Sequence, residues 1–151
     1  MPLTQYNKKR DFNSTNEPFG MKEPSVNKKR VYAIQFHKAS HDHYDLRLEM
    51  GGVLKSWAIP KEPPREKGTK RLAVQTEDHP MDYAFFEGEI PEGNYGAGEV
   101  KLWDKGTYTI INKDKKKIEI KIDGKKLKGN YVLIKTSYGS KPDKSWLFFK
   151  L

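Results

Sequence analysis

The chain has 151 residues, no cysteine and a formal net charge of +9. This length accommodates one domain with a buried core, and the lack of cysteine excludes disulfides and thiolate metal sites. No apolar run approaches the ~20 residues that span a bilayer, and the first residues lack the apolar segment of a secretory signal, so we expect a cytosolic protein with no membrane contact.

Residues 1–30 are polar, with little periodicity, and this predicts an irregular amino-terminal arm. Residues 31–151 consist of short alternating runs separated by turn residues, without a long amphipathic helix. Lys105-Gly106 is predicted to be a turn and residues 78–83 a loop. Many short strands favour an all-β fold, a compact single-domain β-barrel. The predicted strands are 31–37, 43–50, 52–59, 70–77, 98–104, 106–112, 117–122, 130–136 and 145–150.

The stretch from His37 to Glu49 contains three of the four histidines, two aspartates and an arginine. From His43 onward, polar and apolar residues alternate, so the two sets point to opposite faces of a strand. One face carries His43, Asp45, Arg47 and Glu49, and the other carries Tyr44, Leu46, Leu48 and Met50.

The preceding strand has the same pattern, with Gln35 and His37 on its polar face. If the two strands pair as a hairpin through residues 38–42, His37 lies beside His43 on one surface, because five residues is an ordinary length for a hairpin loop.

Two imidazoles and a carboxylate on one surface can hold a divalent transition metal. Arg47 beside them suits a phosphate bound to that metal, because a guanidinium keeps its charge and offers a planar fork of donors. An exposed polar strand face would explain His43 and Asp45 by themselves equally well. The matching positions of His37 and Arg47 favour metal-assisted chemistry on a phosphate ester.

The positive charge is unevenly distributed. Residues 1–30 carry 7 basic and 3 acidic side chains, residues 31–100 carry 8 and 12, and residues 101–151 carry 14 and 5. The candidate metal region is therefore locally acidic, and basic segments flank it. Such an excess attracts polyanions and favours nucleic acid over a small neutral substrate. A lysine-rich soluble surface is the alternative interpretation, and solvated charge also explains Lys61 and Arg71 taken singly, as a surface loop explains His79.

Several motifs follow one another along most of the chain. They are residues 10–18 (Arg10 to Pro18), 37–49, 52–61, 77–83, 86–98, 103–106, 126–129 and 146–147. Together they resemble the 3′-phosphoesterase domain of bacterial DNA ligase D, which also occurs as a free-standing protein.

The resemblance implies a β-barrel with a Mn²⁺-dependent site, in which other divalent transition metals can substitute. It implies action on the 3′ ends of DNA primer–templates or duplexes. Such enzymes remove 3′-terminal ribonucleotides by phosphodiesterase action and then the 3′-phosphate by phosphomonoesterase action. The product is a 3′-hydroxyl that a DNA ligase, expected to act in trans, can seal.

The resemblance also implies residue roles. The implied metal ligands are His37, His43 and Asp45, and the implied phosphate contacts are Arg47 and His79. The other implied catalytic groups are Tyr83, Lys61 and Arg71, with Arg10, Asp11 and Glu17 of the arm directing the ribonucleotide step. His41 departs from the family pattern, and we expect it to be a loop residue rather than a ligand.

Two other functions fit part of the sequence. An Fe(II) oxygenase could use His43 and Asp45, with His79 as the downstream histidine of its triad. A non-catalytic nucleic-acid-binding barrel would fit the basic charge and the aromatic content of 12%. Mn²⁺-dependent release of phosphate would distinguish the phosphoesterase from both.

Overall fold

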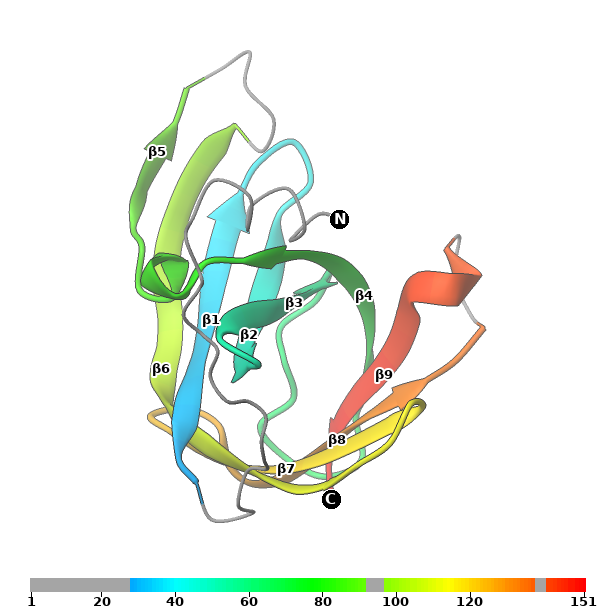
Figure 1. The fold of residues 1–151 in the computed structure, drawn as a ribbon. Coiled ribbons are helices and arrows are strands. Elements are labelled where there is room, and N and C mark those ends of the chain that lie inside the picture. Colours follow the sequence, from blue (N-terminus) through cyan, green and yellow to red (C-terminus); the bar gives the residue numbers. More distant parts are fainter. Residues whose placement is uncertain (1–27, 92–96, 138–140) are drawn as a thin grey trace.

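The computed structural model describes residues 28–91, 97–137 and 141–151. Arg10, Asp11 and Glu17 lie outside these residues. The described chain is almost entirely β-structure, as predicted (Figure 1). Its strands are β1 (Arg30–Lys38), β2 (His43–Met50), β3 (Val53–Ile59), β4 (Lys70–His79), β5 (Gly88–Ile90), β6 (Gly98–Lys113), β7 (Lys117–Gly124), β8 (Lys128–Lys135) and β9 (Ser145–Lys150). Two short 3₁₀ helices, η2 (Met81–Tyr83) and η3 (Pro142–Lys144), complete it, and neither is long enough to cross a membrane.

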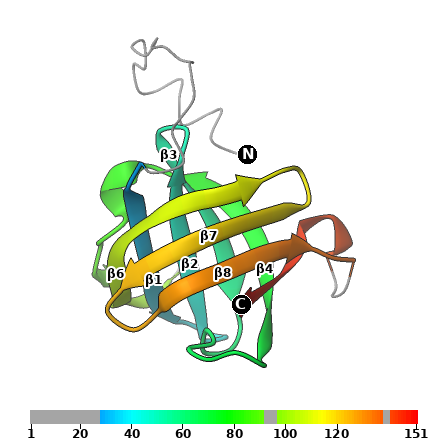
Figure 2. The ribbon, with the colours of Figure 1, turned by 90° about the horizontal axis from the view of Figure 1, so that it is seen from below.

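Eight of the strands close into an antiparallel barrel. Their order is β1-β2-β3-β4-β9-β8-β7-β6, and β6 pairs back to β1 to complete the circle. Figure 2 shows β6, β7 and β8 curving across one side of this barrel, with β1 to β4 behind them. The barrel predicted from the sequence is therefore confirmed.

The long strand β6 differs from the prediction of two strands joined by a turn at residues 105 and 106. It is continuous over 16 residues and pairs along one edge with β1. Its other edge pairs first with β5 and later with β7. Gly106 does not turn the chain. A Cβ atom there would overlap the carbonyl oxygen of Asp123, so glycine allows β7 to approach closely.

A buried carboxylate fastens β6 to the β7–β8 turn. Asp104 is only 4% exposed and accepts hydrogen bonds from the Tyr32 hydroxyl at 2.7 Å and from three successive backbone amides at 2.8, 2.9 and 3.0 Å. The amides are those of Lys125, Lys126 and Leu127. Four donors satisfy the carboxylate, which offsets the cost of burying it.

The main hydrophobic core fills the barrel interior. Most apolar residues of β1 and β2 that the alternation predicted to share a face are buried there, together with large side chains from β3, β7, β8 and β9. Tyr44 of the same face is only partly buried against this core, and Phe36 is half-buried. The fully buried members include Tyr32, Ile34, Leu46, Leu48, Trp57, Ile120, Tyr131 and Phe148. Alternate residues of the same strands point outward, so the polar face of β2 lies on the outside of the barrel.

The chain between β4 and β5 crosses this outer face, as Figure 1 shows. Ala84 packs there in a second, small cluster with Ala33 of β1 and Leu54 of β3. The sequence predicted a loop over residues 78–83, but β4 continues to His79 and η2 follows, and β5 was not predicted. These elements depend on packing against distant strands, which local residue patterns do not encode.

Candidate metal and phosphate site

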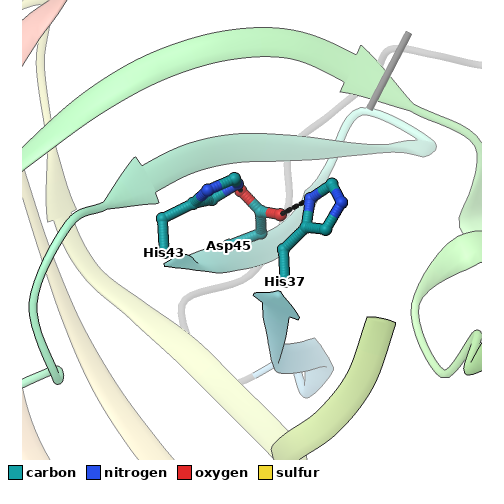
Figure 3. Close-up of side chains that lie close together, drawn as sticks. All are labelled: His37, His43 and Asp45. Atoms are coloured by element: carbon teal, nitrogen blue, oxygen red, sulfur yellow. Dashed lines mark ion pairs between the residues drawn. The ribbon is translucent and has the colours of Figure 1, made fainter. Parts of the chain in front are cut away.

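The β1–β2 hairpin brings two histidines and an aspartate together. His37 pairs directly with His43, as the predicted hairpin requires, and Asp45 follows two residues later on the same face. One potential ligand atom from each of the three residues lies within 4.8 Å of the others. Figure 3 shows the three side chains converging, with His37 on one strand and His43 and Asp45 on the next. The three residues are referred to below as the His-His-Asp group.

The hairpin loop fixes the tautomer of His43. Its Nδ1 lies 3.0 Å from the carbonyl oxygen of His41, which can only accept, so Nδ1 carries the proton. Nε2 faces the Asp45 carboxylate at 3.3 Å. It donates to this carboxylate while it is protonated, and it offers a lone pair to a metal once that proton is lost. Metal-binding histidines commonly donate their second nitrogen to a carbonyl in this way. The side chain of His41 is not part of the His-His-Asp group, in agreement with its assignment to the loop.

Asp45 is the electrostatic centre of the group. It is 7% exposed, and its oxygens lie 3.8 Å from His37 Nδ1 and 3.7 Å from Arg47 Nη2. Burial alone would raise the pKa of Asp45, but the hydrogen bond from His43 and the charge of Arg47 outweigh it and bring the pKa below its usual value. The hydrogen bond to Asp45 in turn raises the pKa of His43.

Arg47 lies two residues beyond Asp45 and is 4% exposed. Its Nε donates to Gln35 Oε1 at 2.8 Å, its Nη1 lies 3.3 Å from His79 Nδ1, and its guanidinium lies 5.1 Å from the centre of the Tyr83 ring. Burial lowers the pKa of Arg47 and Asp45 opposes the effect, but the side chain stays charged at any physiological pH. The site therefore contains a fixed cation next to the His-His-Asp group.

His79 reaches the site through a β-bulge. The pairing of β3 with β4 shifts register between Leu54 and Ser56, so His79, and not Asp78, lies opposite Leu54. Asp78 instead forms an ion pair with Lys55 at 3.0 Å. Bulges commonly redirect side chains beside active sites. Burial, with a smaller effect of Arg47, lowers the pKa of His79 to about 4, so the ring is neutral at neutral pH.

Tyr83 of η2 covers His79, with ring centroids 4.9 Å apart. Burial raises the pKa of Tyr83 although Arg47 opposes the rise, so its hydroxyl is protonated at neutral pH. Tyr83 can therefore donate a hydrogen bond to a phosphate oxygen.

The site forms one open pocket of about 1080 Å³ on the outside of the barrel. Six predicted site residues line it: His37, His43, Asp45, Arg47, His79 and Tyr83. Lys61 and Arg71 are not among its lining residues. Lys61 is exposed, and Arg71 Nε donates to the carbonyl oxygen of Glu62 at 2.8 Å.

Glu77 and Gln35 are among the residues of this site that were not assigned from the sequence. Glu77 lines the pocket, and Gln35 lies beneath it in contact with Arg47. The position of Gln35 on the same strand face as His37 was the available signal. Glu77 belongs to the motif of residues 77–83, but the strand pattern did not place it in the pocket, because the bulge in β4 changes which residues face outward.

The donor set fits a divalent transition metal. Two imidazoles, one with a fixed tautomer, and an ionised carboxylate are the ligands that Mn²⁺, Fe²⁺ and Zn²⁺ share. The oxygenase alternative required His79 as its third ligand, but the structure places His37 in that position and His79 beside Arg47. A phosphate held by Arg47 would lie next to the metal ligands.

Comparison with known proteins identifies the family of the chain. Residues 35–135 match the family of the DNA ligase D 3′-phosphoesterase domain. The multifunctional non-homologous end joining protein LigD of Pseudomonas aeruginosa is 47% identical over 99% of the chain. The LigD protein of Mycobacterium tuberculosis H37Rv is 43% identical over 89% of the chain. The LigD protein of Mycolicibacterium smegmatis is 40% identical over 99% of the chain. The chain spans only 18–20% of the length of these relatives. The matched region includes His37 at the end of β1, the whole of β2 and the β4–β5 crossing. The chain belongs to the DNA ligase D 3′-phosphoesterase domain family.

Proposed function

We propose that the protein is a metal-dependent hydrolase that repairs the 3′ ends of DNA during non-homologous end joining. It removes 3′-terminal ribonucleotides as a phosphodiesterase and 3′-phosphate as a phosphomonoesterase. The observation that supports this most strongly is the grouping of His37, His43 and Asp45 with a buried arginine in one pocket. The names of the relatives add the context of end joining.

We propose Mn²⁺ as the metal, held by His37, His43 and Asp45, and other divalent transition metals can substitute. When bound, such an ion polarises a phosphoryl oxygen and lowers the pKa of water. Asp45 stays ionised for this role because His43 and Arg47 surround it. Because His43 must bind without its Nε2 proton, metal binding competes with protons in acid.

Arg47 is proposed to hold the scissile phosphate. Its Nε is engaged by Gln35, so its two terminal nitrogens, directed to His79 and Asp45, are the ones that can reach a substrate. A planar fork can bind two phosphate oxygens at once and stabilise the charge that grows on them during hydrolysis.

His79 is proposed to move a proton. Its Nδ1 lies 3.0 Å from the carbonyl oxygen of Glu77 and 3.3 Å from Arg47 Nη1. The carbonyl only accepts and the guanidinium only donates, so Nδ1 cannot satisfy both. We assign the proton to Nδ1, because the contact with Glu77 is shorter, which leaves the lone pair on Nε2. The neutral ring can then take a proton from the water that attacks the phosphorus and give it to the leaving oxygen. The leaving oxygen is the 5′ oxygen of the terminal ribonucleoside in the diesterase step and the 3′ oxygen of the primer in the monoesterase step.

The substrate is proposed to be a DNA 3′ end in a primer–template or duplex. The net charge of +9 favours binding of the polyanion. Removal of 3′-phosphate yields a 3′-hydroxyl and inorganic phosphate, and a DNA ligase is the activity that consumes such an end.

The test is incubation of a primer–template with a single 3′-terminal ribonucleotide, with Mn²⁺ or with chelator. We expect shortening of the primer and then release of phosphate only with metal. If the protein binds the primer–template but does not cleave it with any divalent metal tried, the result would support a non-catalytic nucleic-acid-binding barrel instead. Arg47→Lys provides a control for contaminating nucleases, because it preserves the net charge.

A further inference from the structure

Gln35 makes a complete set of hydrogen bonds underneath the pocket. Its side chain has no exposed surface. Nε2 donates to the carbonyl oxygens of Tyr83 and Phe86, both at 3.0 Å, and Oε1 accepts from Arg47 Nε at 2.8 Å. Both N–H groups and the oxygen of the amide are therefore engaged.

The three partners allow only one orientation of this amide. Two of them are carbonyls, which only accept, and the third is an arginine Nε–H, which only donates. A glutamate would keep the bond to Arg47 but would place a carboxylate against two carbonyl oxygens. A methionine of similar length would leave all three partners unsatisfied in a buried place, which costs about 1–3 kcal/mol for each group.

The amide links two parts of the chain that the site needs. Arg47 lies on β2, and Tyr83 and Phe86 belong to the segment that crosses over it between β4 and β5. The Tyr83 ring lies over the Arg47 guanidinium at 5.1 Å and stacks on Phe86 at 5.0 Å. Gln35 thus holds the guanidinium from one side and the backbone that carries the phenol from the other.

We propose that Gln35 is a positioning residue that sets the placement of Arg47 relative to Tyr83, so that both side chains reach the same phosphate. It touches neither the substrate nor the metal and acts through these two groups. The proposal rests on the function proposed above. A displacement of about 1 Å in such a contact can cost on the order of 100-fold in rate.

The test compares Gln35→Met and Gln35→Glu with a matched control, Gln75→Met. Gln75 also accepts a hydrogen bond, from Trp146 Nε1 at 3.1 Å, but does not line the pocket. We expect kcat for release of 3′-phosphate to fall about 100-fold in Gln35→Met, with the affinity for Mn²⁺ unchanged. In Gln75→Met, kcat should stay near wild type after correction for the folded fraction.

A spectroscopic measurement separates positioning from a general loss of structure. The Nε–H of Arg47 should give a slowly exchanging ¹H–¹⁵N signal in wild type, assigned by its loss in Arg47→Lys. We expect it to persist in Gln35→Glu and to disappear in Gln35→Met, while amide signals of β7 and β8 remain. Gln35→Glu should still lose activity, because its carboxylate cannot hold the carbonyls of Tyr83 and Phe86.

The outcomes distinguish this proposal from the proposed function. Wild-type kcat in a folded Gln35→Met variant would overturn the positioning role. If that variant does not fold, wild-type kcat in Gln35→Glu would do the same. If the wild-type protein hydrolyses no 3′-phosphate with any metal, the function fails, but affinity for inorganic phosphate still tests the placement of Arg47. Affinity that is equal in wild type and Gln35→Met would then reject it, because Gln35→Met is the variant that loses the bond to Arg47.

Discussion

His37 and His43 face each other across the β1–β2 hairpin, with ring centroids 4.9 Å apart, and the Asp45 carboxylate lies beside both. Their direct pairing in the register means that no other strand is needed to assemble the three candidate ligands. The hairpin is also the part of the fold with the strongest local sequence signal. Assembly of the proposed metal site is therefore coupled to formation of a single hairpin.

His43→Ala and Asp45→Ala should each abolish metal-dependent hydrolysis of phosphodiester and phosphomonoester substrates. Removing one of three ligands weakens metal binding and displaces the phosphate. Calorimetric titration with Mn²⁺ and release of 3′-phosphate measure the two effects. His41→Ala is the matched control for metal affinity, since the substitution keeps the backbone carbonyl that contacts His43. Full activity of either ligand variant at low Mn²⁺ would remove that residue from the site.

Arg47→Lys should be severely impaired although it keeps the positive charge. Lysine lacks both the planar fork and the Nε–H that donates to Gln35. Losing a transition-state contact of this kind costs on the order of 3 kcal/mol, or about a hundredfold in kcat. Single-turnover kinetics on a 3′-phosphate end would measure it. Turnover at the wild-type rate would show that Arg47 is only a distant counter-charge.

The metal-free protein should lose stability in acid through His79. Burial, with the charge of Arg47, lowers the pKa of this histidine from 6.5 to about 4. Between these two pH values, His79 is therefore protonated in the unfolded chain but not in the folded chain. The free energy of unfolding falls as the pH drops from 6.5 toward 4. The full shift corresponds to roughly 3 kcal/mol.

His79→Gln should remove most of this acid-dependent loss. Urea unfolding at several pH values between about 7 and 4 compares the two proteins. The raised pKa of His43 acts in the opposite direction but is common to both, so it cancels. If the free energies of unfolding of wild type and His79→Gln change in parallel with pH, the pKa of His79 in the folded protein is not lowered.

Asp104→Ala should destabilise the fold without altering the chemistry of the pocket. It leaves three backbone amides and the Tyr32 hydroxyl without their acceptor, at a cost of about 3 kcal/mol or more. Thermal unfolding measures the loss, and Mn²⁺ titration of the folded protein at low temperature is the control. A melting temperature equal to wild type would mean that water replaces the carboxylate.

Deletion of residues 1–20 should separate the two proposed activities. The deletion leaves every strand of the described residues intact, because β1 begins at Arg30. Removal of 3′-phosphate should survive in part, whereas ribonucleotide removal should fall, since the motif with Arg10, Asp11 and Glu17 resembles the family segment for that step. Rates on matched primer–templates, after a check of the melting temperature, decide the matter. Equal loss of both activities in a stable truncation contradicts the division.

The sequence predicted the barrel, the hairpin and the convergence of His37, His43, Asp45 and Arg47 because these follow from the two-residue period of a strand. It did not predict how His79 reaches them. A bulge adds one residue to β4 and exchanges the outward-facing positions, and this depends on pairing with β3. The deviation is invisible to a pattern read along one strand.

Two other features depend on contacts between distant residues. The segment around Tyr83 was predicted to be a loop. Its ordered position was missed because its hydrogen bonds to Gln35 join residues that are 48 and 51 positions apart in the sequence. Gly106 was predicted to form a turn, which is a common position for glycine. In the structure, the lack of a side chain at Gly106 instead allows β7 to pack closely against β6. In both cases, the structural role depends on a residue that is distant in the sequence and close in the fold.

The filled interior of this barrel has a consequence for substrate size. Barrels that bind ligands in their mouths admit only what the opening allows. Here Trp57, Tyr131 and Phe148 close the interior, and the pocket lies on the outer wall. Among the described residues, no aperture would limit how much duplex extends beyond the reacting end of the proposed substrate. We therefore expect described residues that line the pocket, such as His41 and Glu99, to contribute to discrimination among ends. Substrate range and thermal stability can then change by separate sets of substitutions.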